Sequence, residues 1–193
     1  MITVIPSYTL SPKANVDEMT REISEALKWV QKNIQNYNGD AKNIFVTGHS
    51  AGGQLVANAV LNPKFGIDTK SISGIILNDA AGIDMKDYLE KNPPTSEDDY
   101  LTTWSNDPKN WYQASPIHFL DQNSPPFLIY VGSKTYQSIK TANEHFVTKL
   151  NEFQPKVKPI IINKGHIPMV LQYFFPWNKR STEIVDFMQK NKK

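Results

Sequence analysis

The sequence predicts an α/β fold in which a mainly parallel sheet is covered by helices. Five short apolar runs rich in β-branched residues are nearly continuous in hydrophobicity, a pattern typical of parallel strands buried on both faces. Helical patterns separate most of these runs, which implies right-handed crossovers between neighbouring strands. The five runs occupy residues 2–5, 44–47, 72–77, 127–131 and 157–162.

Four helices are predicted between and after these runs. The first has an apolar stripe at helical spacing and opens on Asn15, with Glu18 three residues later as a capping box. Pro63 stops the second helix, and Ser138 is a candidate N-cap of the third. The helices are expected over residues 16–34, 51–62, 139–153 and 181–190.

Composition and charge exclude several classes of protein. The 193-residue chain has no cysteine, which excludes disulfides and thiolate metal sites. Its 21 Lys and Arg against 19 Asp and Glu leave a scattered net charge of +2, which argues against a nucleic-acid partner. No apolar run approaches the roughly 18 residues that span a bilayer, and the first residues lack the features of a signal peptide. We expect one soluble domain over residues 1–193, cytoplasmic by default.

One segment interrupts the alternation of strands and helices. Residues 79–126 show no clear strand, carry several acidic and aromatic residues, and contain Pro93-Pro94. Long insertions of this kind often form lids or specificity loops. A small helical excursion that covers the edge of the sheet explains the segment equally well.

The strongest chemical signal is Gly48-His49-Ser50-Ala51-Gly52, which follows a predicted strand and leads into a predicted helix. This is the pattern of a nucleophile elbow, in which a strained turn presents the serine Oγ above the sheet. We expect Gly48 and Gly52 to let strand and helix pass closely, and the N–H of Ala51 to face a developing oxyanion. The alternative is a glycine-rich structural turn.

A serine nucleophile needs a base to take its proton, and four histidines are available. His166 is the best candidate, because it follows the last predicted strand on a turn; the alternative is a surface loop. His49, inside the elbow, and His145, in mid-helix, are expected to be structural. His118 is expected to line a pocket or to pack.

Several further segments carry a shared pattern. PSYTLSP at residues 6–12 is similar to a "sYrLsP" motif, and Gly165-His166 to a histidine turn. With the elbow, these segments resemble the α/β-hydrolases of the esterase/lipase group, which includes acetyl-xylan and feruloyl esterase-like and kynurenine formamidase-like proteins. The other matching segments are residues 38–44, 114–117 and 125–129.

The sequence departs from this family at the acid of the triad. Family members carry it shortly after the seventh strand, but residues 132–138 contain no Asp or Glu. Asp79, at the end of the strand next to the elbow strand, is the best substitute, because some lipases place their acid there. Glu144, Asp84, and a Ser–His pair without an acid remain open alternatives.

A second departure concerns the N-terminus. The family begins with three further strands and an HGGG-type loop that completes the oxyanion hole, and this sequence has neither. Residues 2–5 resemble the family's fourth strand, which implies a three-layer α/β/α hydrolase fold, N-terminally truncated. The strands at 2–5 and 44–47 then pair directly, or another chain supplies the missing strands, or the sequence is a fragment. Losing a second oxyanion donor is expected to slow turnover by about 10²–10³.

The resemblance implies a serine hydrolase that cleaves a small carboxylic ester without metal or cofactor. His49, Tyr136 and Ile167 are candidate substrate-binding residues. The aromatic run at residues 167–177 could wall an acyl or aryl pocket or pack in the core. The alternative function is a non-catalytic or impaired hydrolase-like protein that binds a ligand or partner. Either protein could form a homo-oligomer through exposed sheet edges.

Overall fold

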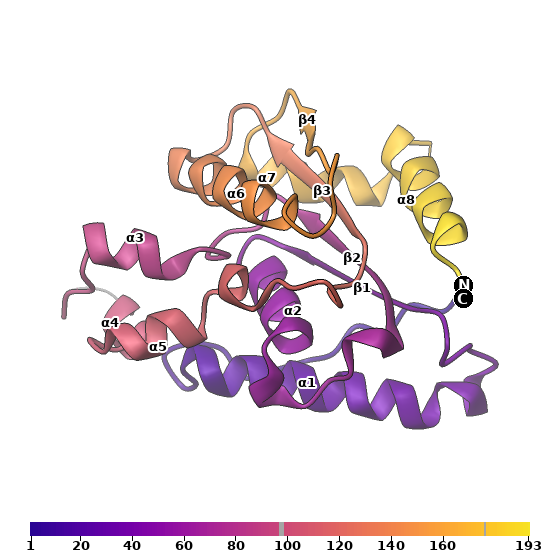
Figure 1. The fold of residues 1–193 in the computed structure, drawn as a ribbon, viewed down its shortest axis with the longest axis horizontal. Helices are drawn as coiled ribbons and strands as arrows, with labels where there is room; N and C mark the ends of the chain where they lie inside the picture. Colours follow the sequence, from indigo (N-terminus) through magenta and orange to yellow (C-terminus); the bar gives the residue numbers. More distant parts are fainter. Residues whose placement is uncertain (97–98, 176) are drawn as a thin grey trace.

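A computed structural model describes residues 1–96, 99–175 and 177–193. Residues 97–98, in the predicted insertion, and Pro176, in the aromatic run, lie outside the described residues. Strands and helices alternate along most of the chain (Figure 1). The 3-10 turns between them are η1 (Ile34–Tyr37), η2 (Pro63–Phe65), η3 (Thr69–Ser71), η4 (Pro116–Phe119) and η5 (Gln172–Phe174).

The centre of the molecule is a parallel sheet with the order β1-β2-β3-β4. Every residue of β2 is buried. This agrees with the continuous apolar run of the sequence, which predicts a strand buried on both faces. The predicted α/β class is confirmed. The strands are β1 (Ile44–His49), β2 (Ile72–Asn78), β3 (Phe127–Gly132) and β4 (Ile160–Ile162).

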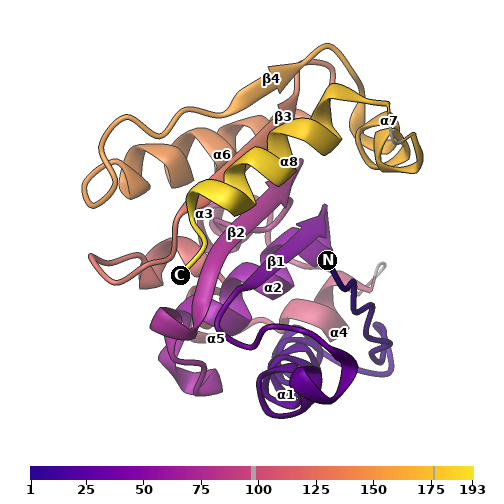
Figure 2. The ribbon, with the colours of Figure 1, turned by 90° about the vertical axis from the view of Figure 1, so that its right-hand side faces the viewer.

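Helices cover both faces of this sheet. Ile75 and Leu77 of β2 belong to the main core cluster, which also contains residues of α2 (Ala51–Leu61) and α6 (Gln137–Leu150). Ile76 faces the opposite side, where Phe187 of α8 (Lys179–Lys190) packs against its cluster. In Figure 2, α8 crosses in front of the sheet and α2 lies behind it. The fold therefore has three layers, and alternate side chains of β2 fill the two interfaces.

The helices agree with the sequence pattern except at some ends; α6, for example, ends at Leu150 and not at the predicted residue 153. The Asn15 side chain accepts hydrogen bonds from the N–H groups of Asp17 and Glu18, and Glu18 accepts one from the Asn15 N–H, so the capping box of α1 (Val16–Asn33) is present. The prediction of Ser138 as an N-cap is wrong, because α6 begins at Gln137, two residues earlier than predicted, and Tyr136 is its N-cap. Helix α8 begins at Lys179 instead of Ser181.

Two strand predictions need correction. Residues 2–5 form no strand and are exposed, so direct pairing with β1 does not occur; a strand forms only where its backbone groups find a partner. The last strand covers only Ile160–Ile162 and is not buried on both faces. Pro159 precedes it and has no N–H for a ladder, and Ile161 is exposed at the sheet edge.

Between β2 and β3 the described residues contain helices and turns but no strand. Met85, Leu89 and Trp111 form a small buried cluster of their own within this segment. The segment is therefore a helical excursion beside the sheet (Figure 1), while a lid function stays a prediction. Its helices are α3 (Met85–Lys91), α4 (Tyr100–Trp104) and α5 (Pro108–Gln113).

Candidate active site

Ser50 occupies a sharp turn between β1 and α2. Its φ of 54° and ψ of −130° lie outside the regions that suit most residues. Helix α2 begins at the next residue, so the Ala51 N–H has no acceptor within the helix. The turn thus has the shape expected of a nucleophile elbow, with a free backbone donor beside the serine.

Gly48 and Gly53 permit this turn, whereas the sequence predicts this role for Gly48 and Gly52. A Cβ on Gly48 would lie 2.3 Å from the carbonyl oxygen of Gly52, and a Cβ on Gly53 would lie 2.6 Å from the Cβ of Ala80. A Cβ on Gly52 would meet nothing within 4 Å. The expectation for Gly52 is therefore wrong; Gly53 makes the close approach, because it faces the segment that follows β2.

His166 is the first residue of α7 (His166–Leu171), a short helix that follows β4. Its Nε2 lies 2.8 Å from the Oγ of Ser50, and its side chain is only 13% exposed. Ser50 and His166 lie 116 residues apart in sequence, and they meet because the carboxyl ends of parallel strands share one edge of the sheet.

Asp79 follows β2 directly and has a φ of 51°. Its side chain is completely buried, and its Oδ2 lies 2.6 Å from the Nδ1 of His166. The rival acids are not partners of His166. Glu144 lies exposed on α6, and Asp84 is hydrogen-bonded to His145 at 2.8 Å. Of the three candidates, the structure brings only Asp79 to the imidazole.

Two donors near the end of β3 also bind the Asp79 carboxylate. The Gly132 N–H donates to Oδ1 at 2.8 Å, and the Thr135 hydroxyl donates to Oδ2 at 2.5 Å. Hydrogen bonds of this kind stabilise a charged acceptor. The sequence analysis does not identify either residue, because residues 132–138 are considered there only as a place for the acid of the triad. If Asp79 is the acid, a threonine in this stretch is a candidate hydrogen-bond donor to it, and Thr135 could have been identified in this way.

The three candidate substrate-binding residues lie around His166. The ring of His49 lies 4.6 Å from that of His166, centroid to centroid, and the ring of Tyr136 lies 5.4 Å away, edge-on. Ile167 is the next residue in α7 and is exposed. All three therefore lie next to the imidazole.

His49 is also bound to the sheet. Its Nδ1 lies 3.0 Å from the carbonyl oxygen of Asn78, so the hydrogen is on Nδ1. Burial lowers the pKa of His49 below its ordinary value, and the neighbouring His166 lowers it further. Both effects favour the neutral form of His49 over the charged form.

The aromatic run after His166 is mostly not core. Met169 is buried, but Phe174 and Trp177 are 75% and 82% exposed, so core packing is wrong for these two residues. Phe174 is the last residue of η5, in which Gln172 is buried, and Trp177 lies in a turn before α8. Among the described residues, no helix combines the length and apolar character that crossing a membrane requires.

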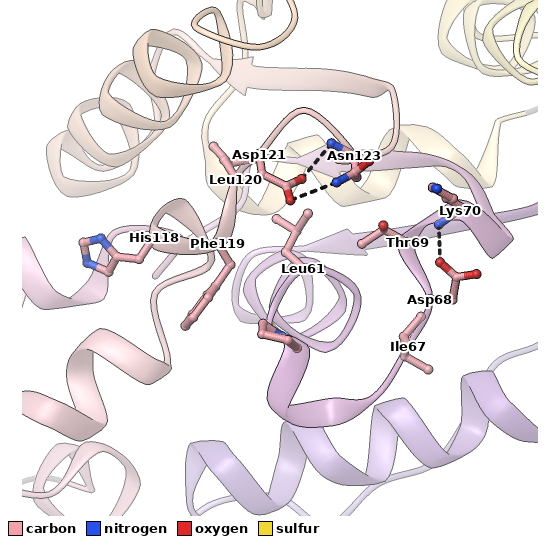
Figure 3. Close-up of a pocket in the computed structure, with 11 residues that line it drawn as sticks. Leu61, Ile67, Asp68, Thr69, Lys70, His118, Phe119, Leu120, Asp121 and Asn123 are labelled. Atoms are coloured by element: carbon pink, nitrogen blue, oxygen red, sulfur yellow. Dashed lines mark hydrogen bonds between the residues drawn. The ribbon is translucent and has the colours of Figure 1, made fainter.

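Ser50, Asp79 and His166 are absent from the lining of a cavity of about 510 Å³, which Figure 3 shows. It opens beside the segments that lead into β2 and β3, whereas Ser50, Asp79 and His166 follow the opposite ends of the strands. His118 lines it, as predicted, and its ring stacks on Tyr112 at 4.2 Å. Other lining residues are Leu61, Ile67, Lys70, Phe119 and Asn123.

A group of ionisable side chains at the start of α3 and on α6 has ligand-type atoms within 4.8 Å of one another: Asp84, Asp87 and His145. His145 is hydrogen-bonded to Asp84, and Lys91 forms an ion pair with Asp87. These internal contacts account for the group, and the predicted structural role of His145 agrees with them.

Comparison with known proteins agrees with this geometry. Residues 1–150 match the BD-FAE family. Esterase LipC of Mycobacterium tuberculosis is 28% identical over 139 residues, which cover 66% of this chain and 34% of LipC. Esterase LipQ of the same organism is 28% identical over 143 residues, 69% of this chain and 34% of LipQ. The chain thus spans about a third of the length of these relatives.

Solved structures share the fold. A truncated form of a carbohydrate esterase from gut microbiota has a TM-score of 0.75 at 20% identity, with 96% of this chain and 72% of that chain covered. Esterase B from Lactobacillus rhamnosis has a TM-score of 0.74 at 14% identity, with 96% and 64% covered. Because the family match spans well over half of the sequence, the chain belongs to the BD-FAE family, with an α/β-hydrolase fold of the esterase/lipase type.

Proposed function

We propose that the protein hydrolyses small carboxylic esters through an acyl-enzyme on Ser50. The observation that carries this proposal is the chain of two short contacts through one imidazole: Ser50 Oγ to His166 Nε2 at 2.8 Å, and His166 Nδ1 to Asp79 at 2.6 Å. This is the arrangement that a serine hydroxyl needs to become a nucleophile.

In the first half of the reaction, the Oγ of Ser50 attacks the ester carbonyl and its proton passes to Nε2 of His166. The N–H of Ala51 donates to the oxyanion of the tetrahedral intermediate. His166 then returns the proton to the leaving alcohol as the C–O bond breaks. Asp79 holds Nδ1–H and stabilises the imidazolium while it exists.

In the second half, water attacks the acyl-enzyme and gives its proton to His166. The intermediate collapses, the acid leaves, and Ser50 regains its proton. Every proton moves between substrate, water, Ser50 and His166, so this chemistry needs no metal or organic cofactor. We propose that His49, Tyr136 and Ile167 contact the substrate, because they adjoin the imidazole that serves the leaving group.

The family match and the esterases among the relatives support this assignment. The exposed position of Ala51, at the start of α2 beside the edge strand β1, favours a slow enzyme or a non-catalytic binding protein as the second candidate. In the described residues we identify one oxyanion donor, and an oxyanion hole with one donor fewer loses about 10²–10³ in turnover.

The test compares the wild-type protein with Ser50→Ala in two assays: hydrolysis of p-nitrophenyl acetate and covalent labelling by a fluorophosphonate. Ser133→Ala is the matched control, because Ser133 is an exposed serine that follows β3 and lies outside the triad. We expect wild type and Ser133→Ala to react and Ser50→Ala to be inert. Equal hydrolysis by wild type and Ser50→Ala, or no labelling of the wild type, supports the non-catalytic alternative.

A homo-oligomer remains a second proposal. In the described part of the chain, β1 and β4 each have one neighbouring strand, and free strand edges can pair with another copy. Sedimentation equilibrium measures the mass directly, and a monomer across the concentration range contradicts oligomer formation.

A further inference from the structure

The three residues of the proposed triad are joined through a fourth residue, Asn78. It is the last residue of β2 and immediately precedes Asp79. Its carbonyl oxygen accepts the N–H of Ser50 at 3.3 Å and the Nδ1–H of His49 at 3.0 Å. Asn78 is thus in contact with the elbow and continuous with the acid.

The side chain of Asn78 reaches the segment that carries the base. Its Nδ2 donates to the carbonyl oxygen of Met169 in α7 at 3.1 Å, and both residues are completely buried. Met169 lies three residues after His166, and its N–H donates a hydrogen bond to the carbonyl oxygen of Gly165. A hydrogen bond to Met169 therefore fixes the turn of helix that begins with the imidazole.

Helix α7 depends on such a bond. It has six residues, and helices this short are not stable on their own. The last carbonyls of a helix have no partner within it. The Met169 carbonyl is one of these, and it receives donors from Asn78 and from Gln172 of the following turn. Gln172 belongs to the same segment, so the Asn78 bond is the one that reaches the sheet.

We propose that Asn78 is a positioning residue, which ties α7 to the end of β2 so that the imidazole of His166 is held between Ser50 and Asp79. The inference rests on the proposed esterase function. It adds that activity depends on a buried amide that touches neither the substrate nor the reacting atoms. A displacement of about 1 Å in a reacting group can lower the rate by about 10²-fold.

The central variant is Asn78→Leu, which keeps a similar volume and removes the amide donor. Asn58→Leu is the matched control. Asn58 of α2 is equally buried, its Nδ2 donates to the carbonyl of Gln113 at 3.1 Å, and its Oδ1 is buried without a hydrogen-bond partner in the described structure. The Oδ1 of Asn78 is likewise buried without a hydrogen-bond partner in the described structure. The two variants therefore lose the same kind of interaction, one beside the triad and one on α2.

We expect Asn78→Leu to lower kcat for p-nitrophenyl acetate by about 10- to 100-fold with KM changed less than about twofold, measured on folded protein. Asn58→Leu should keep the wild-type kcat. Hydrogen exchange should become faster over residues 166–175 in Asn78→Leu alone. A purely structural role predicts equal losses of stability in both variants and an unchanged kcat.

Near-UV circular dichroism and thermal melting establish that each variant is folded. If Asn78→Leu does not fold, Asn78→Ser replaces it. If neither folds while Asn58→Leu does, the role is structural and the inference is overturned. It is also overturned if a folded Asn78 variant keeps kcat within about twofold of wild type. If the wild type shows no esterase activity, the proposed function fails, and hydrogen exchange still tests whether Asn78 holds α7.

Discussion

The carboxylate of Asp79 and the Nδ1 of His166 lie 2.6 Å apart, although 87 residues separate them in sequence. Asp79 follows β2 and His166 follows β4, so both are delivered to the same edge of a parallel sheet. This contact favours the imidazole tautomer with hydrogen on Nδ1, which leaves Nε2 unprotonated, as the proposed attack by Ser50 requires.

Replacing the acid by its amide tests this relationship. Asp79→Asn keeps the shape of the side chain but removes the charge and can stabilise the wrong tautomer of His166. We expect kcat to fall by about 10³–10⁴-fold, as in a triad that loses its acid. Asp84→Asn is the control, because Asp84 binds His145 on another helix. Similar kcat values for Asp79→Asn and Asp84→Asn contradict the role of Asp79.

The hydroxyl of Thr135 is expected to support the acid. Thr135→Val keeps the shape but removes the donor to Asp79 Oδ2. A hydrogen bond to a charged group contributes about 1.5–3 kcal/mol, so we expect kcat/KM to fall by about tenfold or more. Thr148→Val, on the exposed side of α6, removes a hydroxyl bonded to the Glu144 carbonyl and should leave kcat/KM unchanged. Unchanged kcat/KM in Thr135→Val excludes this role.

The sequence predicts some parts of the site well because their signals are local. Ser50 stands in a strand–glycine–helix pattern of ten residues, and His166 follows a short apolar run on a Gly-His turn. Local signals do not decide which of Asp79, Asp84 and Glu144 is the acid that pairs with His166. That choice depends on which strand ends are neighbours, and the backbone N–H of Gly132 that binds Asp79 leaves no pattern in a sequence.

Errors in the predicted fold have a similar cause. Residues 2–5 are as apolar and β-branched as many strands, and residues 157–159, Val-Lys-Pro, lead directly into an apolar run, yet a strand also needs a partner with free backbone groups. Pairing is a long-range property, whereas hydrophobicity is local. The inner strand β2, buried on both faces, was therefore predicted correctly, and the errors fall at the edges.

The stability of the protein should decrease in weak acid. Burial lowers the pKa values of both His49 and His118 below the usual 6.5. At these two residues the unfolded chain therefore binds more protons than the folded one as the pH falls through about 6.5, so their contribution to the free energy of unfolding falls with the pH. His118→Phe keeps a ring to stack on Tyr112 and removes one titrating group. Urea unfolding between pH 7 and 5 should show a weaker pH dependence in this variant; an identical dependence refutes the assignment to His118.

Two neighbouring glycines of the elbow should respond very differently to the same substitution. In Gly48→Ala, the new methyl group would lie 2.3 Å from the Gly52 carbonyl oxygen, a backbone atom that cannot move without opening the turn. In Gly52→Ala, the methyl group meets nothing within 4 Å, and alanine favours helix α2.

We therefore expect Gly48→Ala to destabilise the protein by about 3 kcal/mol and to abolish labelling of Ser50, since strain of this kind displaces the elbow. Gly52→Ala should match the wild type in stability or exceed it by a few tenths of a kcal/mol. Thermal melting measures the first effect and fluorophosphonate labelling the second. If Gly48→Ala melts with the wild type and still labels, the close approach of β1 and α2 at this turn is not what holds Ser50 in its strained conformation.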